Sequence, residues 1–285
     1  MTTIAARLPI ARRPGAFTVF RWELRKLIAQ KRTYIGIGAA LVVPLIFIVA
    51  LAAEGGGGGP DEIPFGSFVR ETGLAVPLVC LSFGAIWLLP LITALVAGDI
   101  VSAEDQNGTL KTILTRSVER WHVFAGKLLA ALVYTFAVLA GYVAIGLVVG
   151  GLAFGFDPLT TLSGTQIGVG RALVLTGAGV LAYFIPLATI ASIAMLFSTI
   201  THNSAAAVVG TLMVSILFQI LGAISALEAI DPYLLSTQFN AWQGLLREPS
   251  DWEPVIRSAW VCALYALPAL GVAFTTFLRR DVTGG

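Results

Sequence analysis

Charged residues are scarce in this chain of 285 residues, where Asp, Glu, Lys and Arg together make up 12% of the sequence. Soluble domains carry about 25% charged residues, so the composition excludes a water-soluble protein. Cysteine and histidine are also rare, with two residues each. The sequence motifs of zinc proteases, thiol redox centres, serine hydrolases and P-loop nucleotide sites do not occur. We therefore expect a chain that is not an enzyme, holds no metal or other cofactor and binds no ATP itself.

The stretches without any charge are long enough to cross a membrane. They cover residues 33–53, 72–98, 128–156, 172–227 and 258–278. Roughly 20 helical residues span a hydrocarbon core of ~30 Å. The stretch from 172 to 227 would reach about 84 Å as one helix, so it must fold back, and residues 201–203 are its only polar break. The sequence thus predicts six crossings.

These patterns predict an all-α membrane protein in three parts. Residues 1–15 form a flexible cytoplasmic tail, residues 16–32 an amphipathic interfacial helix, and residues 33–280 a single six-span transmembrane domain. The predicted spans are about 33–53, 74–98, 121–156, 171–197, 204–227 and 256–278. The aromatic-rich segment 228–254 is predicted to form one or two short helices that cap the outer side. One helical face there would carry Leu234, Leu235, Phe239, Trp242 and Leu246.

The predicted interfacial helix has an apolar and a basic face. The apolar face contains Phe17, Phe20, Leu24, Leu27 and Ile28, and the residues that face away are Arg21, Arg25, Lys26 and Gln30. Such a helix is suited to lying in the headgroup region of a bilayer. The alternative is an ordinary basic flank that only sets the topology.

The basic residues are distributed unevenly along the predicted loops. Fourteen of the eighteen Lys and Arg residues lie before the first span, in the loop 99–127 or after the last span, and four lie in the other loops. The positive-inside rule places the side with more basic residues in the cytoplasm. We therefore expect a protein of the cell (inner) membrane with both termini cytoplasmic.

The cytoplasmic loop from Gly98 to Leu132 is too structured for a simple connector. Thr109 can cap a short helix with Leu110, Ile113 and Leu114 on one side, and Ser117 can cap the next helix, with Glu119 in its first turn. Charged residues flank the short helix: Glu104, Asp105, Lys111, Arg116 and Arg120. This surface is suited to docking a soluble protein. A loop that packs on its own bundle is the alternative.

Residues that could line a transport path are few. The long charge-free stretches contain no Asp, Glu, Lys or Arg that could carry protons or ions. The candidates are therefore mild polar residues: Thr93, Tyr183, Thr189 and Gln219. A role in helix packing is the more common one for such residues, and Gln219 is the best candidate because an amide in hydrocarbon needs a partner.

The loop resembles the signature region of permease subunits of ABC-2-type transporters. In that family a Glu, a Gly-Thr-Leu and a later Arg and Gly-Lys recur at this spacing, and here they are Glu104, Gly108-Thr109-Leu110, Arg120 and Gly126-Lys127. The six spans, the preceding amphipathic helix and the capping segment are also similar, so the resemblance covers about residues 17–280. The family often has Pro where this chain has Ser117, which puts the break between the two cytoplasmic helices in doubt.

The resemblance implies a transport function driven by ATP. Two permease chains, identical or different, would pair in the membrane lipids, and each would rest on a separate ATPase subunit that binds ATP and Mg²⁺. The coupling helix would contain Glu104, Asp105, Gly108, Thr109, Leu110, Lys111, Ile113, Leu114, Arg116 and Arg120. The expected cargo is an amphipathic small molecule, lipid or glycan, moved outward, and no nucleic-acid partner is expected. The alternatives are a scaffold or maturation subunit of such a complex and an ATP-independent carrier or channel.

Overall fold

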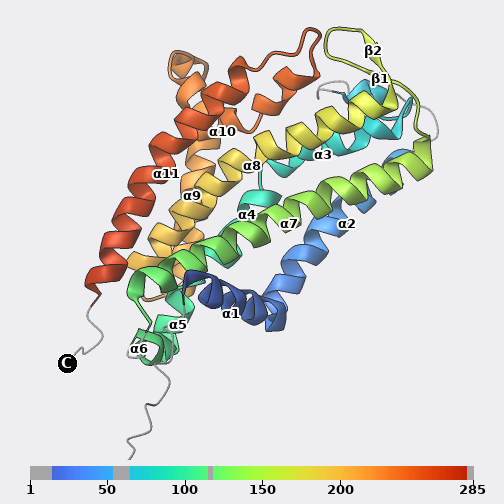
Figure 1. Ribbon diagram of the computed structural model, residues 1–285. Coiled ribbons are helices and arrows are strands. Elements are labelled where there is room, and N and C mark those ends of the chain that lie inside the picture. The colour runs from blue at the N-terminus through green and yellow to red at the C-terminus, as the bar shows by residue number, and fades with distance from the viewer. Residues whose placement is uncertain (1–14, 54–64, 115–117, 281–285) are drawn as a thin grey trace, which may run out of the picture.

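The long apolar stretches form helices, and the computed structural model describes the chain over residues 15–53, 65–114 and 118–280. Five described helices are long and apolar enough to cross a membrane: α2 (Lys31–Ala53), α7 (Arg120–Phe154), α8 (Val169–Ile200), α9 (Ser204–Gly222) and α11 (Glu253–Arg279). A bent pair, α3 (Val76–Gly84) with α4 (Leu88–Ala97), makes a sixth if it is one span. The chain is an all-α, multi-pass membrane protein (Figure 1).

Short elements connect these helices. They are α1 (Ala16–Ala29), η1 (Gly66–Phe68), η2 (Gly73–Ala75), α5 (Ser102–Gln106), α6 (Thr109–Leu114), β1 (Leu159–Thr160), β2 (Gln166–Ile167), η3 (Ser225–Leu227), η4 (Asp231–Tyr233), α10 (Leu235–Gln238) and η5 (Ala241–Leu246). The predicted tail over residues 1–15 lies outside the described residues except for Gly15.

Helix α8 is the central helix of the bundle. In its most apolar stretch 67% of the residues are buried, against 22% to 39% in the other four long helices. It packs against α11, α9, α7 and α4. Small residues such as Ala191 and Ala194 are fully buried along it, and small side chains let membrane helices approach closely. The surrounding helices expose apolar side chains, which suits contact with lipid.

The second predicted span is not a straight helix. The axes of α3 and α4 are bent by 61°. Pro90 lies in α4 and has no N–H, so the carbonyl of Ile86 loses its usual helical donor. Pro77 lies in the first turn of α3, where a missing N–H breaks no helical hydrogen bond. Of the two prolines in this span, only Pro90 therefore contributes to the bend.

Side chains of three neighbouring helices bind backbone carbonyls around this bend. The donors are the Tyr142 hydroxyl to Cys80 (2.7 Å), the Tyr183 hydroxyl to Leu81 (3.0 Å) and the Gln219 amide to Ala85 (3.4 Å). They come from α7, α8 and α9. An irregular backbone at membrane depth is tolerated when neighbouring helices satisfy its polar groups, and these three side chains do so.

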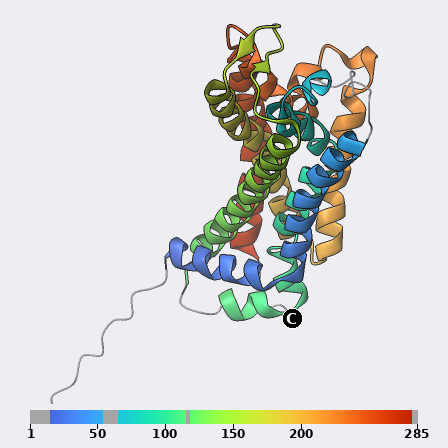
Figure 2. The ribbon, with the colours of Figure 1, turned by 90° about the vertical axis from the view of Figure 1, so that its right-hand side faces the viewer.

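The two ends of the bundle carry different elements. Figure 2 shows α1 lying across one end, with α5 and α6 beneath it. At the opposite end lie α10, η5 and the β1–β2 hairpin (Figure 1). The sequence patterns do not predict this hairpin, in which Leu159 pairs with Ile167. The amide of Leu162 in its turn donates to the carbonyl of Leu246 (3.1 Å), so the hairpin is joined to the capping segment.

Several helix ends differ from the predicted boundaries. The fifth predicted span runs to residue 227, but α9 ends at Gly222 and a separate turn, η3, follows. The third ends at Phe154, before Gly155, whose φ of 82° does not continue a helix. The fourth continues to Ile200, three residues beyond the prediction. Hydropathy locates the apolar stretch, while these local backbone turns decide where each helix stops.

Candidate functional site

Four charged side chains meet where α1, α5 and α7 converge, and we call them the charge cluster: Glu23, Lys26, Glu104 and Lys127. The ammonium of Lys127 lies 2.6 Å from Glu104 Oε2 and 3.1 Å from Glu23 Oε1, and it donates to the carbonyl of Ile100 (3.0 Å). Lys26 pairs with Glu23 (2.8 Å) and with Glu104. Two positive charges thus face two negative ones.

Burial makes this pairing important. Lys127 has no exposed surface, and Glu23 is 5% exposed. A buried charge without a partner is strongly destabilising, so each lysine and each glutamate here depends on the others. The charge cluster consequently ties α5 to both α1 and α7.

The two glutamates and two lysines stabilise one another's charged forms. Burial alone would raise the pKa of Glu104, but the nearby ammonium groups of Lys127 and Lys26 outweigh it and lower that pKa below its ordinary value. Burial alone would lower the pKa of Lys26, but the carboxylates of Glu104 and Glu23 raise it. The ion pairs therefore favour the charged forms of Glu104 and Lys26.

A glycine in α7 brings α1 close enough to complete the cluster. A Cβ atom at Gly126 would lie 2.7 Å from the side chain of Val19 in α1, a distance that real Cβ atoms do not tolerate. Gly126 therefore allows the two helices to touch, and the next residue, Lys127, reaches Glu23. The Gly-Lys pair of the sequence analysis thus has a local structural role.

A second polar junction lies at the end of α4. Asp99, which is 3% exposed, pairs with Arg32 at the start of α2 and accepts a hydrogen bond from the Ser204 hydroxyl at the start of α9. This junction holds the first turn of two long helices against the chain that leads into α5.

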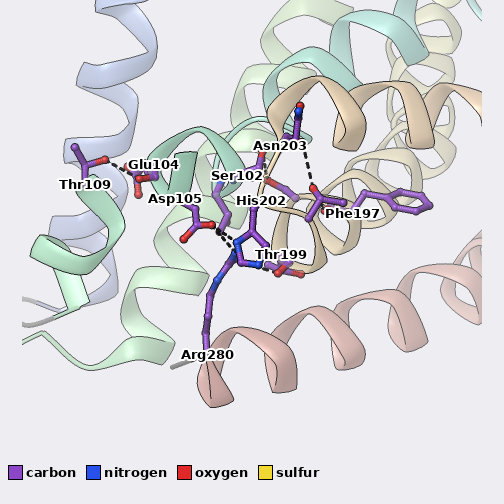
Figure 3. A network of polar contacts seen from close by, with 12 residues as sticks. Ser102, Glu104, Asp105, Thr109, Phe197, Thr199, His202, Asn203 and Arg280 are labelled. Atoms are coloured by element: carbon purple, nitrogen blue, oxygen red, sulfur yellow. Dashed lines mark hydrogen bonds and ion pairs between the residues drawn. The ribbon is translucent and has the colours of Figure 1, made fainter. Parts of the chain in front are cut away.

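A third junction, shown in Figure 3, holds the side of α5 that faces away from α1. Asp105 Oδ2 accepts from Arg280 Nη2 (2.8 Å) and contacts His202 Nδ1. Arg280 Nη1 also donates to the carbonyl of Thr199 (3.1 Å). His202, within the polar break predicted at residues 201–203, thus lies in the turn between α8 and α9 and joins it to α5 and the end of α11.

The start of α5 is capped by a residue of α8. The hydroxyl oxygen of Ser198 accepts from the N–H groups of Val101 and Ser102, both at 3.0 Å. The first N–H groups of a helix have no partner within it, and Ser198 supplies one from a different helix. Together with the three polar groupings, this cap holds α5 at a fixed place on the bundle.

The predicted coupling residues are only partly on the surface. Glu104 and Asp105 belong to the polar groupings above, Thr109 is exposed, and Arg120 donates to the carbonyls of Leu278 (2.7 Å) and Arg280 (2.8 Å). Leu110 was expected on an outward apolar edge, but it is 2% exposed and belongs to the chain's own core. The side chains of Lys111, Ile113 and Leu114, and all of Arg116, lie outside the described residues.

The turn between α5 and α6 differs from the prediction in its capping. Gly108 has a φ of 69°, a conformation that favours glycine. The Thr109 hydroxyl donates to the carbonyl of Glu104 (3.1 Å). The next helix, α7, begins at Arg120, so Glu119 is its N-cap residue rather than part of its first turn. Ser117, the expected cap, lies outside the described residues.

The buried side of the interfacial helix does not coincide with its predicted apolar face. The buried side chains of α1 are Val19, Glu23 and Leu27, while Phe17 is 68% exposed and Ile28 62% exposed. Phe20 and Leu24 pack partly against the core, and Arg21 and Arg25 are exposed as expected. Lys26 turns toward the charge cluster instead of outward. The electrostatic attraction of Glu23 and Glu104 for the Lys26 ammonium explains this orientation. A hydropathy pattern does not contain that information.

The candidate path residues divide into two kinds. Thr93, Tyr183 and Thr189 are at most 2% exposed, so they lie in the packed interior of this chain. Thr189 donates to the carbonyl of Ile185 (3.2 Å), the usual bond of a threonine on a membrane helix. Gln219 differs, because it also lines an open polar cavity of about 360 Å³ with Asp231 and Asn240.

No group of His, Cys, Asp and Glu suited to a metal ion occurs among the described residues. Cys80 and Cys262 are both buried and free. Sequence reasoning missed that Lys127 is buried and that Glu23 and Lys26 join it and Glu104 in one cluster. The signals for this were Glu23, the only acidic residue of α1, and Lys127, a charge well inside a helix that enters an apolar span.

Comparison with known proteins gives one family relationship. Residues 40–283 match a family described as "Protein of unknown function (DUF2705)". The chain belongs to this DUF2705 family. The match begins within α2, extends through α11 and includes Glu104, Lys127 and Arg280. No curated protein matches the chain at a significant level.

Proposed function

We propose that this DUF2705 protein is the transmembrane permease subunit of an ATP-driven transporter of ABC-2 type. The observation that carries the proposal is the charge cluster, which joins α5 to α7 through a buried ion pair and to α1 through a partly exposed one. A soluble partner that pushed on the α5–α6 segment would move these helices with it. The residues of the permease signature, Glu104 and Gly126-Lys127, are the ones that form this connection.

The contact surface for such a partner differs from the apolar edge that the sequence suggested, because Leu110 is buried. An apolar cavity of about 320 Å³ opens between α1 and the α6–α7 region, lined among others by Trp22, Thr109 and Val118. An apolar side chain of the partner would fit there, and interface contacts of this kind are where binding energy concentrates. The α5–α6 segment and α1 would then form one docking surface.

The proposed topology has six crossings with both termini in the cytoplasm of a cell (inner) membrane protein. The contacts of the bent pair support it. Next to α3, the amide of Gly73 donates to the carbonyl of Gly155, at the far end of α7. Just after α4, Asp99 pairs with Arg32 at the near end of α2. The pair thus extends from one end of the bundle to the other, as a crossing does.

ATP and Mg²⁺ would bind to a separate ATPase subunit, since this chain has no P-loop. A second permease chain would complete the path, and the cargo would be an amphipathic small molecule, lipid or glycan moved between the two chains. The absence of ionisable groups from the apolar stretches supports an energy source outside the bilayer.

The first test is co-purification of the full-length chain from its native membrane. We expect a soluble P-loop ATPase to accompany it. Gln106→Arg, at the exposed end of α5, should weaken that association, whereas Gln166→Arg, the same change in the exposed hairpin at the opposite end, should not. Equal retention in both variants would reject the docking site.

Activity then separates the proposal from its alternatives. If the chain moves a substrate in vesicles without ATP, the carrier or channel reading replaces it. If the ATPase binds but no substrate moves when ATP is supplied, the scaffold or maturation reading replaces it. For the topology, a cysteine at Gln106 should react only from the cytoplasmic side and one at Gln166 only from the outer side.

A further inference from the structure

A polar cavity lies where α8 and α11 end, beside the junction of Figure 3. Its volume is about 370 Å³, and its lining consists of Thr199, Ile200, His202, Thr276, Arg279 and Arg280. Two guanidinium groups and two hydroxyl groups therefore border one cavity at the end of a membrane-length helix.

Among the described residues around this cavity, positive charge exceeds negative charge. Arg280 is paired with Asp105, but no carboxylate is described in contact with Arg279, which is exposed. The guanidinium of Arg120 donates to the carbonyls of Leu278 and Arg280 at the end of α11. These bonds satisfy part of the negative end of α11, which would otherwise oppose an anion. The cavity therefore favours an anionic ligand.

The chemistry of the lining fits a phosphate group. Arginine presents a planar set of N–H donors that matches phosphate oxygens. Arg280 uses Nη1 on Thr199 and Nη2 on Asp105, which leaves other N–H groups of its five. The hydroxyl of Thr276 lies one helical turn before Arg279 and Arg280, so it can reach the same group.

The surface of α11 leading to the cavity is apolar. Leu264, Pro268 and Val272 precede Thr276 at four-residue intervals and are exposed, which places all four on one side of the helix. Leu264 is 63% and Val272 51% exposed. Along this side the chain presents apolar groups, then a hydroxyl, then guanidinium groups. A phospholipid presents acyl chains, glycerol and phosphate in the same order.

We infer that this cavity binds the phosphate of an anionic membrane phospholipid. The acyl chains lie along the apolar side of α11, and the phosphate lies between Arg279, Arg280 and Thr276. Basic pockets between helices at a membrane surface are known to hold anionic headgroups. Since Arg280 also holds Asp105, a bound lipid contacts the junction that fixes α5. The inference requires no ATPase partner and stands apart from the proposed function.

The experiment measures the affinity of the purified full chain, in neutral detergent, for a short-chain phosphatidylglycerol. Arg279→Gln removes one charge-assisted contact and should weaken binding about tenfold. Thr276→Val should weaken it by less. Arg257→Gln, the same substitution near the other end of α11, is the matched control and should leave the affinity unchanged.

Two competitors identify the source of the phosphate. Short-chain phosphatidylcholine, which has no net charge, and inorganic phosphate, which has no acyl chains, should each bind more weakly than phosphatidylglycerol. Inorganic phosphate that binds as tightly as the lipid would overturn the assignment to a lipid. Equal losses in Arg279→Gln and Arg257→Gln would reduce the effect to general charge attraction, and no loss in Arg279→Gln would also refute the inference.

Discussion

Replacing Lys127 with methionine is a direct test of the charge cluster. Methionine keeps much of the side-chain volume and removes the charge. The change leaves Glu23 and Glu104, whose side chains are 6% and 14% exposed, facing only Lys26. Removing one partner of a buried ion pair costs about 3–5 kcal/mol of folding free energy. Because Lys26 still offsets one carboxylate, we expect a loss of about 3 kcal/mol.

The exposed fraction of each lysine predicts a clear ranking. The side chain of Lys26 is 41% exposed, and partly solvated pairs contribute about 1 kcal/mol or less. A loss of 1 kcal/mol lowers Tm by about 2 °C for a chain of this size. Lys127→Met should therefore lower Tm by about 6 °C and Lys26→Met by about 2 °C or less. Lys31→Met, at an exposed position, is the matched control.

Thermal unfolding of the purified chain, followed by tryptophan fluorescence in one detergent, measures this ranking. Adding Glu104→Gln to Lys127→Met should restore part of the lost stability, because the double variant leaves one carboxylate, Glu23, for one ammonium group, Lys26. The reasoning is refuted if Lys127→Met and Lys26→Met lower Tm equally, or if the losses of Lys127→Met and Glu104→Gln simply add.

Three further changes follow from local contacts, and the same unfolding assay checks them. The lowered pKa of Glu104 stabilises the fold at pH values above 4.5, the ordinary pKa of a glutamate, and the raised pKa of Lys26 stabilises it at pH values below 10.5, the ordinary pKa of a lysine. The free energy of unfolding should therefore decrease at strongly acidic and at strongly basic pH. Glu104→Gln should reduce the decrease at acidic pH. Gly36→Ala places a Cβ atom 2.3 Å from the Tyr134 hydroxyl oxygen and should cost about 1–3 kcal/mol, less when combined with Tyr134→Phe; an equal loss in both backgrounds would contradict this contact. Asn203→Ala removes the side-chain cap of α9 and should cost about 1 kcal/mol, whereas an unchanged Tm would show that the cap does not contribute.

The sequence was sufficient to identify the apolar helices. The partition of long charge-free stretches into a membrane is a property of local composition, and it does not depend on which helices touch. The bend between α3 and α4 is different. The polar groups at the bend are satisfied by Tyr142, Tyr183 and Gln219. These residues lie 62, 102 and 134 positions along the chain from the carbonyls that they bind. No local pattern identifies such partners.

The candidate site was predictable only as a list of residues. The signature named Glu104 and Lys127, but the burial of Lys127 follows from the close approach of α1 at Gly126. The same approach turns Glu23 inward and makes Lys26 a partner of Glu104. Leu110 was predicted to face outward but is buried. An apolar residue on a short helix can face either a partner or the protein's own core, and the sequence does not distinguish the two.

The distribution of charge suggests how a movement of α5 would spread. In the described part of the chain, the ion pairs on α5 connect it with α1 and α7 and with the end of α11. Moving α5 alone would separate Glu104 from Lys127, and Lys127 has no exposed surface through which water could replace its partner. That separation costs several kcal/mol, more than the sliding of apolar helices past lipid, which exchanges one apolar contact for another. The low-energy response to a push on α5 is therefore a joint displacement of α1, α5 and α7, and this is the motion that a permease would need in order to turn an event at its cytoplasmic surface into a rearrangement of its spans.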